Sequence, residues 1–319
     1  MQLSLVIPLL NEADSLPELH ARIKKVCDDE NISYEILFID DGSTDDSWKI
    51  ISHLAIEHPE IKGLKFAKNY GKSQALHAAF QQAIGNVVIT MDADLQDFPE
   101  EIPSLFHKII TEKNDLVSGW KRKRFDNRLT KNLPSKLFNW AARKTSGVYL
   151  HDFNCGLKAY RNEVVKNIDV HGDMHRYIPV LAKNAGFSKI VEKEVPHQAR
   201  VHGKSKFGAN RFTRGFLDLI TLWFISRFGS RPMHFFGLVG TIMFLLGLLA
   251  TFIIICHKLF LVFYLHKNAG LVTENPLFYL SLVGMILGTQ LFIAGFLGEM
   301  ISRGRRPHHD YIISEKINL

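Results

Sequence analysis

Short apolar runs rich in β-branched residues alternate with amphipathic segments along about the first 120 residues. The apolar runs favour strands and cover residues 3–9, 35–39, 63–66, 87–91 and 115–118. The segments between them repeat apolar residues at helical spacing and cover residues 16–26, 48–56, 73–84 and 102–110. This alternation predicts right-handed βαβ units and an α/β fold with a mostly parallel sheet. In such sheets, ligands bind at the carboxyl ends of the strands.

The C-terminal third of the chain has a different pattern. Residues 235–256 and 276–298 form two runs without any charged residue or histidine. A bilayer core about 30 Å thick needs about 20 helical residues, so both runs are long enough to span it. Before them, residues 216–228 are apolar and aromatic but interrupted by charge, as in a helix that lies in the membrane interface. The pattern excludes a simple cytosolic enzyme, a fibrous protein and a disordered chain.

These changes in pattern predict three parts: a soluble domain at 1–208, a juxtamembrane amphipathic helix at 209–231, and a two-helix anchor with a short cytoplasmic tail at 232–319. The formal net charge is +7, and basic residues gather before the first span and after the second. The positive-inside rule therefore places both termini and the soluble domain in the cytoplasm, at the inner (plasma) membrane, with a short outer hairpin. Gly240, Gly247, Gly284 and Gly288 would let the spans pack closely, and oligomeric state stays open.

Two acidic motifs follow predicted strands. DADLQD at 92–97 offers two carboxylates one residue apart, which suit Mg²⁺ or Mn²⁺ together with the diphosphate that the ion neutralises. A solvated acidic turn is the alternative. DDGSTDD at 40–46 is good turn chemistry, and it also offers acids that accept hydrogen bonds from a nucleobase or ribose.

Other common sites are absent from the sequence. No GxGxxG follows the first strand, which argues against NAD or FAD. The three cysteines form no CxxC pair, and no HExxH motif occurs, so neither a disulfide framework nor a metalloprotease-type zinc motif is indicated.

Several motifs in order give the chain a specific resemblance. They are VIPLLNE, FIDDGSTDDS, the N-x-GK-x-x-A segment at 69–75 and DADLQDFPEEIP. Together they resemble glycosyltransferase family 2, with its Rossmann-like GT-A fold. HDFNCGLKAYR at 151–161 and RVHGKSKFG at 200–208 make the chain similar to the polyprenyl-phosphate glycosyltransferases, such as dolichyl-phosphate mannose synthase and bacterial enzymes that glycosylate undecaprenyl phosphate.

The resemblance implies roles for individual residues. Asp94 would be the direct metal ligand, assisted by Asp92, and Gln96 would lie beside the sugar or metal. Residues implied to bind the nucleotide sugar are Pro8, Glu12, Ile39, Asp41, Lys72, Asp92, Ala93, Arg200 and Lys206. Lys121 and Lys158 stand where some relatives have Arg, and Lys cannot form the bidentate fork of Arg.

A strongly basic stretch follows the fifth predicted strand. Residues 119–144 hold nine basic residues and one acid, interleaved with apolar side chains suited to a membrane surface. Residues expected there to bind the lipid phosphate are Lys121, Arg122, Arg128, Lys131 and Ser135. A solvated basic face is the alternative. Asp152 either caps a loop or acts near the sugar, where it orients the acceptor or serves as a base.

These observations predict an inverting, metal-dependent transfer from a nucleotide sugar, UDP-linked rather than GDP-linked, to a polyprenyl phosphate such as undecaprenyl phosphate. A phosphate monoester is largely dianionic at pH 7, so no strong base is required. No nucleic-acid partner is expected. One alternative is a processive family 2 synthase, which usually shows a QxxRW motif and more spans. Another is a nucleotide-sensing transporter subunit, although Gln290 is the one notable polar residue within the spans.

Overall fold

The computed structural model of the chain divides into two compact units. A sheet unit comprises residues 1–223 and 309–319, and a hairpin unit comprises residues 224–308. The structure describes residues 1–122, 143, 146–170, 172, 174–198, 224, 228, 231–266, 270–304, 311 and 313–319. Each unit is described by itself below.

The sheet unit is built on eight strands in the order β7-β5-β6-β4-β1-β2-β3-β8. β1 (Leu3–Leu9), β2 (Tyr34–Asp40), β3 (Ile61–Phe66), β4 (Val87–Thr90), β5 (Leu116–Trp120) and β7 (Ile190–Glu194) run in one direction. β6 (Lys158–Arg161) and β8 (Ile313–Ile317) run against them. The mostly parallel α/β sheet predicted from the sequence is confirmed, within a mixed sheet.

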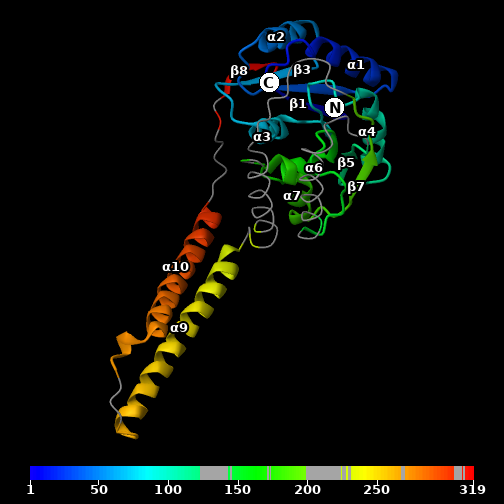
Figure 1. Ribbon diagram of the computed structural model, residues 1–319. Helices are drawn as coiled ribbons and strands as arrows, with labels where there is room; N and C mark the ends of the chain where they lie inside the picture. Colours follow the sequence, from blue (N-terminus) through cyan, green and yellow to red (C-terminus); the bar gives the residue numbers. More distant parts are fainter. Residues whose placement is uncertain are drawn as a thin grey trace. The chain divides into compact units, whose positions relative to one another are not determined.

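Helices cover both faces of the sheet (Figure 1). α1 (Leu16–Asp29), α2 (Ser47–Glu57) and α4 (Ile102–Ile110, preceded by the 3₁₀ turn η1, Pro99–Glu101) contribute to one core cluster. α3 (Lys72–Gln82), α6 (Asn162–Lys166) and α7 (Ile178–Asn184, preceded by η2, Met174–Tyr177) contribute to the other. Alternate residues of the central strands enter opposite clusters, as in β1, where Leu5 faces one and Val6 the other. Strands buried on both faces explain the continuous apolar runs of β1 and β2.

Three strands escaped the sequence analysis. β6 and β7 are short and come after the basic stretch, where the regular alternation of strand and helix ends. β8 lies beyond the second apolar run, in the segment expected to be a cytoplasmic tail of the anchor. Instead it pairs antiparallel with β3, with Gly63 opposite Ile317 and Leu64 opposite Lys316.

Side chains fasten β8 to its neighbours. Trp48 Nε1 and Lys65 Nζ both donate to the carboxylate of Glu315, and Ser314 Oγ donates to the carbonyl of Lys65. The ring of Tyr311 stacks on Phe66 with centroids 4.9 Å apart. The C-terminal segment is therefore part of the sheet unit, because it covers what would be an exposed strand edge.

The hairpin unit contains two helices that are long and apolar enough to cross a membrane. They are α9 (Pro232–Phe263) and α10 (Pro276–Gly304), and the turn η3 (Val272–Glu274) lies between them. Both predicted spans fall inside these helices. Phe224 and Phe228 lie in the expected interfacial helix, whose other residues are outside the described part, and their rings contact Phe235 and Phe236.

Glycines bring the two long helices into backbone contact. A Cβ on Gly240 would lie 2.5 Å from the carbonyl oxygen of Gly288, and one on Gly288 would lie 2.6 Å from that of Gly240. A Cβ on Gly247 would similarly meet the carbonyl of Ser281 at 2.6 Å. Gly284 imposes no such limit, since its nearest neighbour would be 3.8 Å away. Small residues at these positions permit the close packing on which membrane helices depend.

Candidate functional site

The acidic motifs meet at one edge of the sheet. β1, β2 and β4 are parallel, so the segments that follow Leu9, Asp40 and Thr90 leave from the same edge. β6 is antiparallel to β4, and its first residue, Lys158, lies opposite Thr90. The segment before β6 therefore lies at the same edge of the sheet. There the hydroxyl of Thr90 donates a hydrogen bond to the carbonyl of Gly156 at 2.8 Å.

Asp92 is held between a lysine and a glycine. Lys72, the first residue of α3, donates to its Oδ1 atom. A Cβ on Gly156 would lie 2.5 Å from Oδ2, so the carboxylate packs directly on that backbone. Burial by itself would raise the pKa of Asp92, but the ammonium groups of Lys72, Lys121 and Lys158 outweigh burial and lower this pKa to about 2. Asp92 is thus ionised at every physiological pH.

Behind Asp92, Lys121 and Asp97 form a buried ion pair. Their N–O distance is 2.6 Å, and their side chains are 10% and 0% exposed. Burial would lower the pKa of Lys121, but Asp97 reverses this and raises it. Lys121 therefore faces the acidic loop. Its ammonium group is largely enclosed by the protein, and its expected role in binding the lipid phosphate stays a prediction.

Asp94 lies at a sharp turn of the DADLQD loop. The next residue, Leu95, is fully buried and has a φ of 57°, in the left-handed region. This turn lets the backbone N–H of Gln96 donate to Oδ1 of Asp94 at 3.2 Å, while the Asp94 side chain remains partly exposed. The amide of Gln96 donates to the carbonyl of Gln198, and Gln198 donates in return to that of Leu95. These bonds fasten the loop to the segment that leads to Arg200.

The DDGSTDD turn uses its carboxylates differently. Oδ1 of Asp41 accepts the N–H of Tyr70 at 2.7 Å, and Oδ2 accepts that of Gly71 at 2.9 Å. Asp40 is fully buried and accepts the N–H of Ser43 at 2.7 Å. Burial raises the pKa of both acids, and these hydrogen bonds oppose the rise. The turn therefore connects β2 to the start of α3, which carries Lys72.

Other residues expected around the nucleotide occupy varied environments. Pro8 lies beside Ile39 in the β1–β2 register and is partly exposed, as is Glu12, whose backbone N–H donates to Ser47. The side chains of Ile39 and Ala93 lie in the core clusters, 0% and 3% exposed. These two residues could therefore reach a nucleotide mainly through their backbone, and their expected role stays a prediction.

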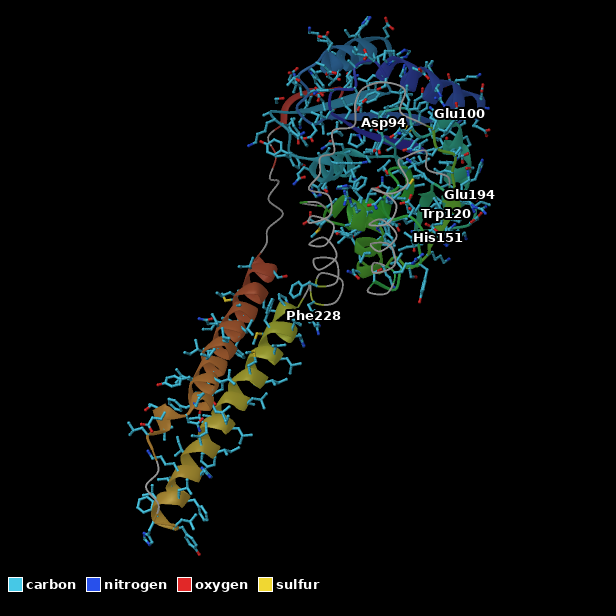
Figure 2. All side chains as sticks on the ribbon, in the orientation of Figure 1. Asp94, Glu100, Trp120, His151, Glu194 and Phe228 are labelled. Carbon is cyan, nitrogen blue, oxygen red and sulfur yellow. The ribbon has the colours of Figure 1, made fainter. Side chains whose placement is uncertain are left out.

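Asp152 is a buried turn residue. It is 2% exposed, and its Oδ1 atom accepts the N–H of Asn154 at 3.0 Å. Glu192 of β7 accepts the backbone N–H groups of both His151 and Asp152. Next to them, His151 stacks on Trp120 with ring centroids 4.3 Å apart (Figure 2). These contacts agree with the loop-capping interpretation of Asp152.

A small cavity with basic walls lies beside Lys72. Its volume is about 20 Å³, and Lys158, His175 and Arg176 also line it. Lys158 is 3% exposed and donates to the carbonyls of Phe153 and Cys155. Burial lowers the pKa of His175, and the nearby positive charges of Lys72, Arg176 and Lys158 lower it further, to about 3. This imidazole is therefore neutral at pH 7. Its Nδ1 atom lies 3.1 Å from Oγ of Ser73.

Apart from Pro8, Glu12, Ile39, Asp41, Ala93 and Asp152, whose places are given above, the predicted site residues fall into three groups. Asp92, Asp94, Gln96, Lys72 and Lys121 meet around one loop. Arg122 is 66% exposed and lies 3.6 Å from Glu194. Five others lie outside the described residues: Arg128, Lys131, Ser135, Arg200 and Lys206.

Sequence reasoning missed Gly156, His175 and Gln198. The HDFNCGLKAYR motif contains Gly156 next to chemistry-bearing residues, so that glycine was detectable in principle. His175 and Gln198 stand in no recognisable motif, since α3 and the DADLQD loop reach them across more than 100 positions of sequence.

With this geometry in place, comparison with known proteins defines the class. The model of the family described as Glycosyl transferase family 2 matches residues 4–169. The chain belongs to this family. Glucosyl-3-phosphoglycerate synthase from Mycobacterium tuberculosis, solved with Mn²⁺, UDP-glucose and phosphoglyceric acid, shares the fold: its TM-score is 0.54 at 20% identity, over 70% of this chain and 79% of that one.

Curated relatives resemble the chain over nearly its whole length. Dodecaprenyl-phosphate galacturonate synthase of Rhizobium johnstonii is 34% identical over 95% of this chain and 88% of its own. Undecaprenyl-phosphate 4-deoxy-4-formamido-L-arabinose transferase of Shewanella sediminis is 37% identical over 94% and 87%, respectively. The Aeromonas hydrophila protein of the same name is 34% identical over 94% and 88%. The similarity thus includes the hairpin unit.

Proposed function

We propose that this protein is an inverting glycosyltransferase that moves a sugar from a nucleotide sugar onto a membrane polyprenyl phosphate. The observation that carries the proposal is the set of charges around the DADLQD loop. The carboxylate of Asp92 is influenced by the ammonium groups of Lys72, Lys121 and Lys158, and that of Asp97 by Lys121, Asp92 and Asp94. The names of the relatives, which act on dodecaprenyl and undecaprenyl phosphates, support the choice of acceptor.

The donor set fits a divalent cation. Asp94 offers a partly exposed carboxylate, whereas Asp92 already pairs with Lys72, so Asp94 would be the main protein ligand. Mg²⁺ and Mn²⁺ often bind through one or two carboxylates and substrate phosphates. When bound, the ion would neutralise charge on the departing diphosphate. The negative charges of the three acids balance the positive charges of the three lysines. A bound divalent ion would therefore give the surroundings of the loop a net positive charge, which favours binding of a diphosphate.

The reaction exchanges one bond at the anomeric carbon for another. An acceptor phosphate oxygen forms the new C–O bond, the C–O bond to the nucleoside diphosphate breaks, and configuration inverts. The acceptor arrives ionised, since the second pKa of a phosphate monoester is about 6. The protein then has to align the partners and stabilise the leaving group. This is compatible with an enclosed, hydrogen-bonded Asp152 that acts as a loop cap.

The test follows the sugar label. Full-length protein in detergent receives undecaprenyl phosphate, Mg²⁺ or Mn²⁺, and a panel of labelled UDP- and GDP-sugars. We expect label from a UDP-sugar to enter the organic phase, with Asp94→Asn inactive and Asp28→Asn, on the exposed surface of α1, fully active. Label in a water-soluble polymer would instead indicate a processive synthase. Nucleotide binding without any transfer would indicate a sensing subunit.

We also propose that the basic stretch captures the lipid phosphate through Arg122, Arg128, Lys131 and Ser135. The reason is its dense positive charge among apolar residues, which suits an anionic membrane surface. Kinetics on Arg128→Ala should show a raised KM for the lipid and little change for the nucleotide sugar. A raised donor KM would assign the stretch to the diphosphate.

The proposal places the sheet unit and both termini in the cytoplasm, at the inner membrane. β8, after the second long helix, pairs with β3, before the first, so the chain must cross the membrane an even number of times between them. In a chain whose exposed Cys256 has been replaced by Ser, a cysteine at Asn268 should react with an impermeant reagent in intact cells. One at Lys316 should not react, and the reverse result would invert the orientation.

A further inference from the structure

Two histidines and a glutamate, side chains of types that can bind metal ions, meet near the amino end of β3. His20 lies in α1, His58 directly follows α2, and Glu60 directly precedes β3. One ligand atom from each lies within 4.8 Å of the other two. β3 runs parallel to β4, so the amino end of β3 and the carboxyl end of β4 are at opposite edges. The group is thus separate from the proposed transfer site.

His20 is the unusual member of the group. It is only 5% exposed, and within the part of the chain that the structure describes its Nε2 atom is buried and has no hydrogen-bond partner. Buried polar atoms almost always find a partner, because an unpartnered one has lost its water without compensation. Imidazole nitrogen is the commonest metal ligand in proteins, and this one faces the other two side chains of the group.

The geometry fits a zinc ion with modest adjustment. The rings of His20 and His58 are 4.5 Å apart and tilted by 49°, and His58 Nδ1 lies 3.5 Å from Glu60 Oε1. Bonds of about 2.0–2.2 Å in a tetrahedral site put neighbouring ligand atoms about 3.4 Å apart. The ligand atoms lie within 4.8 Å of one another, so any separation above about 3.4 Å must shorten; the side chains of His58 and Glu60 can move because they are 24% and 21% exposed.

We propose that His20, His58 and Glu60 bind one Zn²⁺, with water as the fourth ligand. Two imidazoles and one carboxylate form a donor set that zinc accepts and that Mg²⁺ disfavours. The hydroxyl of Tyr34 lies 3.5 Å from Glu60 Oε1, where it would orient that carboxylate as an outer partner. The ion would tie α1 to the segment between α2 and β3, and this role is independent of the proposed function.

The test measures Zn²⁺ binding to the full-length, untagged protein by calorimetry, with excess Mg²⁺ present to occupy the carboxylate site. Because His20 is buried, the variants are His58→Asn and Glu60→Gln, which change partly exposed side chains. The matched control is His53→Asn. His53 lies on α2 only 3.9 Å from Glu57, which gives it a histidine–glutamate pair, and it belongs to no cluster of three among the described residues.

We expect one Zn²⁺ per chain, with affinity reduced more than about tenfold in His58→Asn and Glu60→Gln and unchanged in His53→Asn. Zinc should also raise the melting temperature of the wild type and of His53→Asn, but not that of His58→Asn or Glu60→Gln. Co²⁺ bound to the wild type should give the visible absorption bands of a tetrahedral site. Equal Zn²⁺ affinity in all four proteins would overturn the proposal and leave an ordinary contact between His58 and Glu60 beside His20. Label transfer from the nucleotide sugar tests the proposed function separately.

Discussion

Two turns at the same edge of the sheet are both rich in aspartate but have different surroundings. DDGSTDD follows β2, and its inner acids accept N–H groups from the backbone of residues 43, 70 and 71. DADLQD follows β4, and Asp92 and Asp97 face lysine ammonium groups. The first turn holds loops in place. In the second turn, the carboxylates pair with ammonium groups at the ends of flexible lysine side chains.

The difference shows that the donors around a carboxylate decide its role. A backbone N–H is fixed by the fold, so an acid that accepts it becomes part of the framework. A lysine ammonium can exchange its partner when a diphosphate or a metal ion arrives, so the same acid becomes part of a binding site. The predictions below test this distinction, from the largest expected effect to the smallest.

Asp94→Asn should lower the rate of sugar transfer by about 10²-fold or more, which is the usual loss when one preorganised electrostatic group is removed. Its melting temperature should stay near that of the wild type, because the side chain is partly exposed. The matched control from the other turn is Asp46→Asn, which changes an exposed acid paired with Lys49 and should remain active. Full activity of Asp94→Asn, or activity retained in chelator, would remove the metal from the proposal.

Gly156→Ala should reduce activity by about 10- to 10²-fold, because its Cβ would displace the carboxylate of Asp92. Steady-state kinetics on purified protein would measure the loss. Gly284→Ala is the control, since its Cβ would have no neighbour closer than 3.8 Å. If Gly156→Ala kept wild-type rates, the position of Asp92 would not matter for the reaction.

Asp41→Asn should mainly cost stability. The amide cannot accept both N–H groups as the carboxylate does, so we expect a loss of about 1–3 kcal/mol and a clear fall in melting temperature. Activity at a temperature well below the transition should change less than tenfold. Unchanged stability with a much weaker nucleotide affinity would mean that Asp41 binds the nucleotide directly.

His175, in the small cavity that Lys72 and Lys158 also line, should make the stability of the protein depend on pH. Its pKa is about 3 in the folded protein and near 6.5 when unfolded, so between these values the unfolded state binds an extra proton. Stability should therefore fall as pH drops from 6.5 toward 3, by up to about 1.4 kcal/mol per pH unit. Melting curves of His175→Gln should show a weaker pH dependence, and identical curves would contradict the assignment.

The elements that the sequence predicted correctly are those with strong local patterns. β1 to β5 are apolar runs between helices of regular spacing, and both long helices are uncharged runs of membrane length. β6, β7 and β8 were missed because each lies outside the regular alternation of strand and helix and depends on a partner far away in the chain, with Ile317 opposite Gly63 as the extreme case. The sequence also located the DADLQD loop but could not assign the surroundings of Lys121.

By itself, the sequence determined the mostly parallel character of the sheet, the two apolar helices and the acids from which a metal site would be built. Those properties follow from residue type and spacing over a few turns of chain. Only the tertiary structure decided that Asp41 supports a loop, that Asp92 rests on Gly156, and that His20, His58 and Glu60 meet. The reason is physical: hydrogen bonding, burial and charge depend on which side chains come within a few ångströms of one another, and the fold sets those distances between residues far apart in the chain.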